Sequence, residues 1–155
     1  MATVYLGLGS NLGDCRRNLA CAITELETKV RVVALSSVLC TKPMYVTEQP
    51  DFYNQVIEIE TTISVLDLLE VTKNIEVKMG RTPTYRYGPR VIDIDMLYYD
   101  QLIFKNSILQ IPHPHNDERE FILALMSELA PTFICPVTKT TIMEKLTLLK
   151  QKTAA

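Results

Sequence analysis

The strongest constraint on the fold is the order in which strand-like and helix-like hydrophobic patterns follow one another. Alternating or β-branched stretches predict four strands, at residues 3–8, 30–41, 52–62 and 91–99. Apolar residues at helical spacing predict helices over 15–28 and 64–79, with Asp14 and Ser64 as N-caps. The resulting order, β-α-β-β-α-β, is that of a ferredoxin-like α+β sandwich, in which two helices pack on one face of a mainly antiparallel sheet.

The rest of the chain is expected to add elements to this sandwich. A further helix begins near Asn116 or Asp117 and must end by Pro131, because proline cannot continue a helix. The weakly patterned C-terminal residues that follow predict a short additional helix or strand. With 155 residues and no internal repeat or linker, the chain is expected to form a single domain over 1–155.

Composition excludes several classes of protein. A formal net charge of −2 and a pI near 5.7 give no general reason to bind nucleic acid or an acidic membrane. No uncharged apolar run approaches the roughly 20 residues that a bilayer span needs. The four cysteines have no C-x-x-C spacing, which excludes the usual zinc-ribbon and thioredoxin signatures. Scattered thiols in a chain of this size are typical of the cytoplasm, where we expect the protein to act.

Two acidic residues share one face of the strand predicted over 91–99. The stretch reads VIDIDMLYYD, so that Asp93 and Asp95 point away from the face taken by the apolar residues between them. The two lie about 6.6–6.8 Å apart along the strand. Such a pair repels and costs desolvation energy, and a bound cation removes both penalties. Carboxylates without histidine or cysteine spacing suit Mg²⁺. The alternative, a solvated edge strand with two acids, is left open by the pattern alone.

A basic loop leads directly into this strand. Between residues 77 and 92 there is no acid and there are four cations: Lys78, Arg81, Arg86 and Arg90. The three arginines lie in the glycine- and proline-punctuated segment GRTPTYRYGPR, and the planar guanidinium suits bidentate contact with phosphate oxygens. A helix-capping or solubilising role is the alternative. Cations beside a candidate metal pair favour a polyphosphate substrate, which needs both.

Glu76 is an acid on the inner stripe of the helix predicted over 64–79. It follows Thr72 by four residues and precedes Met79 by three, so it shares their face of the helix. Its carboxylate is therefore either solvated at the edge of the stripe or held by a partner, for which the loop arginines are candidates.

Three of the five glycines cluster in the sequence GLGSNLG at residues 7–13. The spacing is not the G-x-G-x-x-G dinucleotide fingerprint, and the chain has no P-loop motif. We interpret the cluster as a strand-to-helix turn that needs positive φ, with Asn11 placed to use its amide locally or on a ligand.

Both histidines lie in the segment IPHPHNDEREF. His113 is held between two prolines and is followed by Arg119, a combination that suggests phosphate contact. An ordinary surface role is the alternative for His113 and the favoured reading for His115. No serine, cysteine or histidine triad can be argued from the sequence.

Taken together, these motifs resemble those of a known enzyme family. The chain carries, in order, GLGSN, TKP followed by QPDFYN, GR followed by RYGPRVIDIDMLYYD, and IPHPHNDEREF. This series, over residues 3–131, is similar to that of the 6-hydroxymethyl-7,8-dihydropterin pyrophosphokinases. The resemblance implies a ferredoxin-like fold and a step of folate biosynthesis. In that step the β,γ-pyrophosphoryl group of ATP moves to the hydroxymethyl oxygen of the pterin, and AMP is released.

The resemblance also implies roles on the phosphate side of the site. Asp93 and Asp95 would ligate two Mg²⁺ ions that bridge the ATP phosphates. Arg81 and Arg90 would stabilise charge on the transferring group and, with the two aspartates, make up the catalytic set. The residues expected to bind ATP are Leu69, Lys73, Glu76, Arg81, Arg90, Ile94, His113 and Arg119.

On the pterin side, the ring would stack between Phe52 and Phe121, and Asn54 would read its amide-like edge. The residues expected to bind the pterin are Thr41, Pro43, Met44, Phe52, Asn54 and Phe121. The implied partners are ATP and a hydroxymethyl-dihydropterin. Nucleic acid and membrane are not expected as partners, and the protein is expected to be a monomer.

Four positions depart from the usual pattern of the family. Tyr87 stands where tryptophan is common, Pro83 where many members have a second loop arginine, His115 where arginine is frequent, and Tyr45 where many have glycine. These positions concern the loops that would close over ATP. The proposed metal and pterin residues are unaffected.

Two other functions fit parts of the sequence. A ferredoxin-like ligand-sensing module without catalysis would explain the fold and the aromatic residues, but not the acidic pair and the arginine loop together. A nucleic-acid binder would need a basic surface and an RNP-like aromatic pattern, and the sequence has neither. The pyrophosphokinase function is therefore the prediction taken forward.

Overall fold

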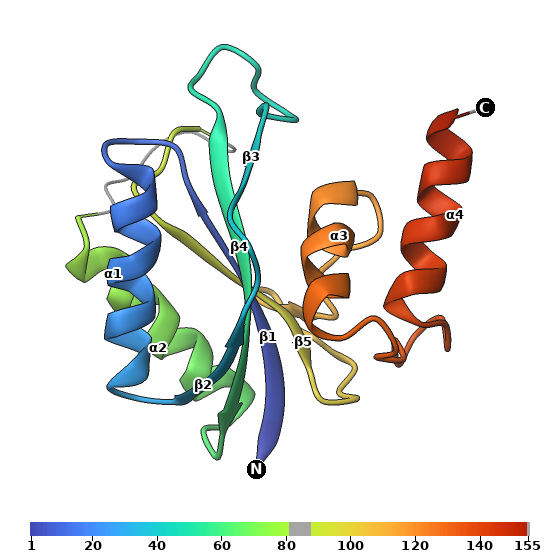
Figure 1. The fold of residues 1–155 in the computed structure, drawn as a ribbon. Helices are drawn as coiled ribbons and strands as arrows, with labels where there is room; N and C mark the ends of the chain where they lie inside the picture. The colour runs from blue at the N-terminus through green and yellow to red at the C-terminus, as the bar shows by residue number, and fades with distance from the viewer. Residues whose placement is uncertain (81–87, 155) are drawn as a thin grey trace.

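The computed structural model describes residues 1–80 and 88–154, and its centre is a five-stranded antiparallel sheet (Figure 1). Four strands run in the order β2-β4-β1-β5, and β3 also pairs with β4. Every one of these pairings is antiparallel, as predicted. The strands are β1 (Ala2–Ser10), β2 (Arg31–Leu35), β3 (Leu39–Thr41), β4 (Phe52–Thr61) and β5 (Asp93–Tyr99).

Helices cover both faces of the sheet in the described part of the chain. On one face lie α1 (Cys15–Glu27) and α2 (Val65–Lys78), and on the other lie α3 (Glu120–Leu129) and α4 (Ile142–Ala154) (Figure 1). Two short strands, β6 (Phe104–Lys105) and β7 (Gln110–Ile111), form a separate ribbon. Within residues 1–80 and 88–154, no helix has the length and apolar character needed to cross a membrane.

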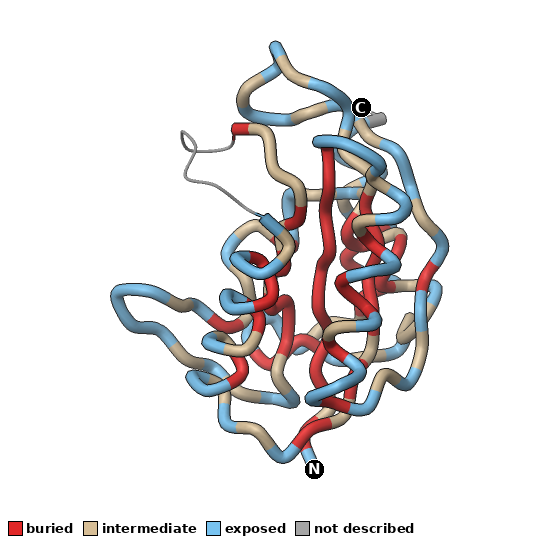
Figure 2. Tube along the Cα trace, turned by 90° about the vertical axis from the view of Figure 1, so that its left-hand side faces the viewer, coloured by how far each residue is buried: buried red, intermediate tan, exposed pale blue. Residues whose placement is uncertain are grey.

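Each face of the sheet has its own apolar core. The core beneath α1 and α2 includes Leu6, Leu26 and Ile59, which are fully buried. The core beneath α3 and α4 includes Tyr98 and Leu123. Figure 2 shows the long buried stretches that run through the middle of the molecule, where β1 and β4 lie. Because both faces are covered, β1 is buried along nearly its whole length, whereas the second half of β4 alternates the buried Ile57 and Ile59 with the half-buried Glu58 and Glu60.

The segment predicted as one strand over 30–41 is divided in two, and this prediction was wrong. The break falls at Ser36, whose side chain is buried. Its Oγ accepts a hydrogen bond from the Val56 N–H at 2.9 Å, while its own N–H donates to the Val56 carbonyl at 2.9 Å. The Ser36 hydroxyl thus takes the place of a backbone carbonyl as the acceptor for one N–H of the sheet. The β-branched composition of the segment gives no sign of this.

The helix expected from Asn116 or Asp117 begins later, at Glu120. Residues 112–119 are irregular, and the buried Asn116 donates through Nδ2 to the Leu97 carbonyl at 3.0 Å instead of capping a helix. The remaining predicted boundaries fall within two residues of the observed ones, and the C-terminal addition is the helix α4.

Replacing Ser36 with alanine should destabilise the protein. The Val56 N–H would lose its buried acceptor, which should cost about 1–3 kcal/mol of the free energy of unfolding. Urea denaturation measures this loss. Ser37→Ala is the matched control, because the Ser37 hydroxyl makes an exposed contact with Glu128. Equal, small losses in the two variants would contradict the role assigned to Ser36.

Candidate active site

A cavity of about 320 Å³ opens where β1 ends and β4 and β5 begin, beside the irregular segment 112–119. Its wall holds most of the residues predicted to bind substrates: Thr41, Pro43, Met44, Phe52, Asn54, Lys73, Arg90, Asp93, Asp95, His113, Arg119 and Phe121. Of the other predicted residues, Ile94 and Leu69 pack in the core beneath α1 and α2. Arg81, like the family departures Pro83 and Tyr87, lies outside the described residues.

The floor of the cavity is formed by the pairing of β1 with β5. In this register Gly7 lies opposite Asp95, and Gly9 lies opposite Asp93. A Cβ at Gly7 would stand 3.2 Å from the Leu97 side chain, so this glycine serves close packing. Of the glycine cluster, only Gly13 has positive φ, at 73°. The prediction of a positive-φ turn is therefore right for Gly13 and wrong for the two strand glycines, both of which line the cavity.

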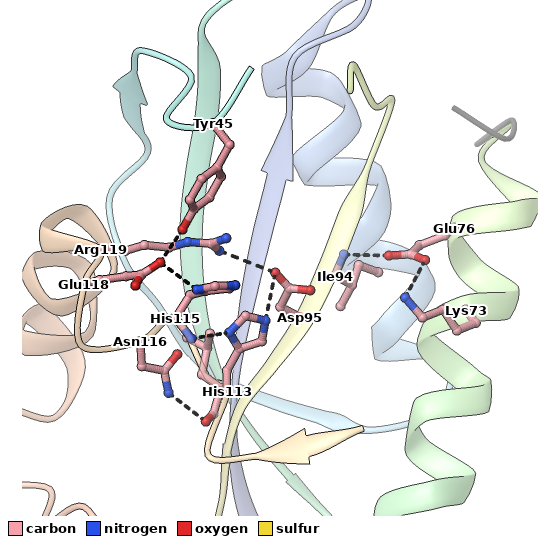
Figure 3. A network of polar contacts seen from close by, with 11 residues as sticks. Tyr45, Lys73, Glu76, Ile94, Asp95, His113, His115, Asn116, Glu118 and Arg119 are labelled. Atoms are coloured by element: carbon pink, nitrogen blue, oxygen red, sulfur yellow. Dashed lines mark hydrogen bonds and ion pairs between the residues drawn. The ribbon is translucent and has the colours of Figure 1, made fainter. Parts of the chain in front are cut away.

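Asp95 lies at the centre of a polar network (Figure 3). Its Oδ2 is 3.8 Å from His113 Nε2 and 3.9 Å from Arg119 Nη1, and its side chain is 29% exposed. Burial and the neighbouring Asp93 carboxylate raise the pKa of Asp95 well above its usual range, while Arg119 and Lys73 act in the opposite direction. Two adjacent acids therefore share a site that favours a bound cation.

The acidic pair fits Mg²⁺ better than a metal that requires an all-protein cage. Among residues 1–80 and 88–154 there is no group of three or more His, Cys, Asp or Glu that could hold a metal. Mg²⁺ usually binds through one or two carboxylates and completes its shell with water and substrate phosphates. Asp93 and Asp95, both on the cavity wall, supply that donor set.

His113 is oriented by the backbone of the segment that contains it. Its Nδ1 accepts a hydrogen bond from the His115 N–H at 3.1 Å, which leaves the ring proton on Nε2, the atom that faces Asp95. Burial and the nearby Arg119 lower the pKa of His113 to about 4. At neutral pH, His113 therefore presents a neutral N–H donor to the cavity.

Glu76 is held by partners beneath the acidic pair, which settles one of the alternatives left by the sequence. It is buried, and its Oε2 accepts a hydrogen bond from the Ile94 N–H at 2.7 Å. Its Oε1 lies 3.3 Å from Lys73 Nζ. Ile94 stands between the two aspartates, so Glu76 fixes the backbone that projects both carboxylates (Figure 3).

Asn11 connects three segments at the rim of the cavity. Its N–H donates to the Arg90 carbonyl at 3.0 Å, and its Oδ1 accepts from the Arg90 N–H at 2.8 Å. Its Nδ2 donates to Gln49 Oε1 at 2.8 Å and to the Pro50 carbonyl at 3.0 Å. The amide is thus used locally, and it fixes the backbone of Arg90 at the cavity wall.

Aromatic and amide groups also line the cavity. Phe52 and Phe121 both contribute to its wall. The Asn54 Nδ2 donates to the Thr41 Oγ1 at 2.8 Å, and the Asn54 Oδ1 lies 3.7 Å from the position that a Cβ at Gly9 would take. These residues therefore offer the cavity aromatic side chains and an oriented amide oxygen.

Sequence reasoning missed the contact of Tyr45 with the segment 112–119. The Tyr45 hydroxyl donates a hydrogen bond to Glu118, and Arg119 lies over the Tyr45 ring at 5.6 Å from its centroid. His115 Nδ1 is 2.6 Å from Glu118 Oε1. Tyr45 and Glu118 are 73 positions apart, so spacing gives no signal of this contact.

Comparison with known proteins decides the family. Residues 5–131 match the family described as 7,8-dihydro-6-hydroxymethylpterin-pyrophosphokinase (HPPK). The chain is 36% identical over 137 residues to the 2-amino-4-hydroxy-6-hydroxymethyldihydropteridine pyrophosphokinase of Aquifex aeolicus, covering 88% of this chain and 86% of that protein. It is 41% identical over 136 residues to the enzyme of the same name from Methylorubrum extorquens, covering 86% of each. This chain belongs to the HPPK family.

Family membership confirms the resemblance seen in the sequence. The family description, a pyrophosphokinase of 7,8-dihydro-6-hydroxymethylpterin, agrees with the reaction predicted from the sequence. The chain is also 45% identical over 133 residues to the Dictyostelium discoideum protein "Folic acid synthesis protein FOL1", covering 86% of this chain and only 20% of that longer protein. Among solved structures, the wild-type Plasmodium falciparum HPPK-DHPS shares the fold. Its TM-score is 0.80 at 16% identity, over 97% of this chain and 45% of that one.

Asp95→Asn should stabilise the ligand-free protein. A raised carboxyl pKa means that the folded state disfavours the charged form, so wild-type stability is lost as pH rises from the ordinary carboxyl range through the raised pKa. Asparagine removes that loss, and we expect a gain of about 1 kcal/mol in the free energy of unfolding at pH 8 and little gain at pH 4. Urea denaturation in EDTA measures it, with the exposed Asp51→Asn as control. A less stable Asp95→Asn protein at pH 8 would refute the argument.

Proposed function

We propose that this chain transfers the pyrophosphoryl group of ATP to the hydroxymethyl oxygen of 6-hydroxymethyl-7,8-dihydropterin and releases AMP, with two Mg²⁺ ions as cofactors. The observation that carries this proposal is one cavity whose wall holds two chemically different sets of groups. One set combines the acidic pair with cations, and the other combines aromatic side chains with an oriented amide. A polyphosphate needs the first set and a flat heterocycle needs the second.

The ATP phosphates would lie over β5. Asp93 and Asp95 would hold the Mg²⁺ ions, which when bound neutralise charge on the phosphate oxygens. Arg90 and Arg119 line the same wall and would contact the oxygens directly through their guanidinium groups. His113 would add a neutral N–H donor, since its Nε2 faces the same space as Asp95.

The pterin would lie at the other end of the cavity, between Phe52 and Phe121. The Asn54 Oδ1 can accept a hydrogen bond from the amide-like edge of the ring, because its Nδ2 is already committed to Thr41 and to backbone carbonyls. This end would orient the hydroxymethyl group toward the phosphates. The two substrates then meet within one cavity without a large movement of the sheet.

The chemistry needs no nucleophilic side chain, because the substrate hydroxyl is itself the attacking group. The work of the protein is to align that hydroxyl with the β-phosphorus and to stabilise the charge that develops on the transferring group. Arg90 is suited to the second task, because both its N–H and its carbonyl are hydrogen-bonded to Asn11. A fixed backbone limits the reorganisation needed as charge develops.

We further propose that the first six elements form a ferredoxin-like sandwich and that the protein acts as a monomer in the cytoplasm, without nucleic acid or membrane as partners. The strand order β2-β4-β1-β5, with α1 and α2 on one face, supports the ferredoxin-like assignment. The net charge of −2 gives no reason to bind nucleic acid.

Product identification tests the proposed reaction. The protein is incubated with ATP, Mg²⁺ and 6-hydroxymethyl-7,8-dihydropterin, and the nucleotides are separated by ion-exchange chromatography. AMP should form in step with the pterin pyrophosphate, and EDTA should abolish both. ADP as the sole nucleotide product would overturn the pyrophosphoryl assignment.

Asp95→Ala should remove one of the two acidic ligands and leave the fold intact. We expect turnover to fall by at least about 10³-fold, which corresponds to roughly 4 kcal/mol of activation free energy. Steady-state AMP formation at saturating Mg²⁺ measures the loss, and circular dichroism checks the fold. Near-normal turnover would mean that the pair is only a solvated strand face.

Arg90→Ala should lower kcat more than it changes pterin affinity, because a cation aimed at developing charge acts mainly in the transition state. Its backbone bonds to Asn11 do not need the side chain, so the loop should stay in place. Steady-state kinetics with each substrate varied in turn separate the two effects. A large loss of pterin binding at unchanged kcat would contradict the assigned role.

A further inference from the structure

The C-terminal helix α4 lies outside the family match at residues 5–131, yet it is linked to the active site. Its residue Lys145 contacts Asp117, which lies in the irregular segment 112–119. The same segment carries His113 and Arg119 on the cavity wall. The proposed reaction uses neither Lys145 nor Asp117, so their contact needs its own explanation.

The contact is an ion pair between a buried lysine and an exposed carboxylate. Lys145 Nζ lies 2.8 Å from both Oδ1 and Oδ2 of Asp117. The Lys145 side chain is only 7% exposed, whereas that of Asp117 is 58% exposed. A buried ammonium is costly unless it is paired, so Lys145 depends on Asp117 more than the reverse.

The backbone around this lysine is held in place by the first turn of α4. Thr141 Oγ1 accepts a hydrogen bond from the Glu144 N–H at 3.1 Å, and Glu144 Oε1 accepts one from the Thr141 N–H at 3.4 Å, which forms a capping box. Ile142 and Leu146, on either side of Lys145, are buried in the core beneath α3 and α4. A cation in the first turn opposes the helix dipole, so this position is not favoured for the helix itself.

The segment 112–119 has few other fixed points. His113 N–H and Asn116 Nδ2 both donate to the Leu97 carbonyl of β5, at 3.1 and 3.0 Å. These bonds hold the first half of the segment. In the second half, Lys145 holds Asp117, two positions before Arg119, where the chain is not yet helical, and Tyr45 donates a hydrogen bond to the neighbouring Glu118. Sheet and helix α4 thus hold the segment from opposite ends.

We propose that Lys145 is a positioning residue, which acts through Asp117 to hold the segment 112–119 so that Arg119 faces the site of the phosphates. The part of this inference that concerns phosphates rests on the proposed function. The part that concerns the order of the segment does not. Phe121 should be little affected, because α3 is held by its own buried residues Ile122, Leu123, Leu125 and Met126.

Lys145→Met tests the proposal. Methionine fills a similar apolar space and leaves Asp117 hydrated, so the protein should still fold. Backbone amides of residues 113–119 should exchange hydrogen faster than in the wild type, in protein without ligands. The affinity for α,β-methylene ATP with Mg²⁺ should fall about fivefold, the size of a typical pairwise coupling. Pterin affinity at saturating nucleotide analogue should not change.

Three further variants sharpen the test. Lys150→Met, on the exposed side of the same helix, should behave as the wild type in both measurements. Lys145→Arg restores the cation and should recover most of the analogue affinity. Lys145→Met combined with Asp117→Asn should add nothing to Lys145→Met alone, because both changes break the same link.

A folded Lys145→Met protein with wild-type exchange at 113–119 and wild-type analogue affinity would overturn the proposal. If Lys145→Met does not fold, Asp117→Asn is measured in its place, and unchanged exchange in that variant would have the same meaning. Absence of AMP formation by the wild type would refute the proposed function instead. It would leave the exchange result as an independent measure of the link between α4 and the segment.

Discussion

The geometry of the site depends on the antiparallel pairing of β1 with β5. This register places the two aspartates opposite Gly7 and Gly9, so each carboxylate lies across from a position without a side chain. The register is fixed from the other face of β5, where Ile94 and Met96 are buried beneath α1 and α2. A slip of one residue would bury the acids and expose these apolar side chains. Hydrophobic packing on one face of the sheet therefore determines the position of the acids on the other.

The arrangement concentrates negative charge at a cost to the ligand-free fold. Glu76 adds a third carboxylate near the pair, and it raises the pKa of Asp95 further. Its bond to the Ile94 N–H gives this acid a structural role, since the bond fixes the strand between Asp93 and Asp95. Lys73 and Arg119 offset part of the repulsion. Repulsion between neighbouring carboxylates is expected at a functional site that binds cations and substrate.

Local pattern predicted the periodic elements, while contacts between distant residues had to be seen in the structure. The alternation around Asp93 and Asp95 gave their strand and shared face correctly, because side-chain direction in a strand is a local property. The break at Ser36 was missed because its hydroxyl pairs with Val56, twenty positions away. The partners of Glu76 and the contact between Tyr45 and Glu118 are equally non-local. The sequence motifs identified the family, whereas the contacts between the motifs were visible only in the structure.

The described acids and cations of the site lie on different kinds of backbone structure. This difference affects how far each group can move. Asp93 and Asp95 project from a strand paired along its length, whereas Arg90 and Arg119 come from irregular segments fixed at a few points. Residues on a paired strand keep their separation, and the proposed sharing of metal ions by two carboxylates would require this. Segments held at few points open more readily, so in the proposed reaction their cations could follow phosphate oxygens whose positions change during transfer. Those points then limit how far the cations can move. They are Asn11 for Arg90, and the Leu97 carbonyl, Lys145 and Tyr45 for the segment of Arg119.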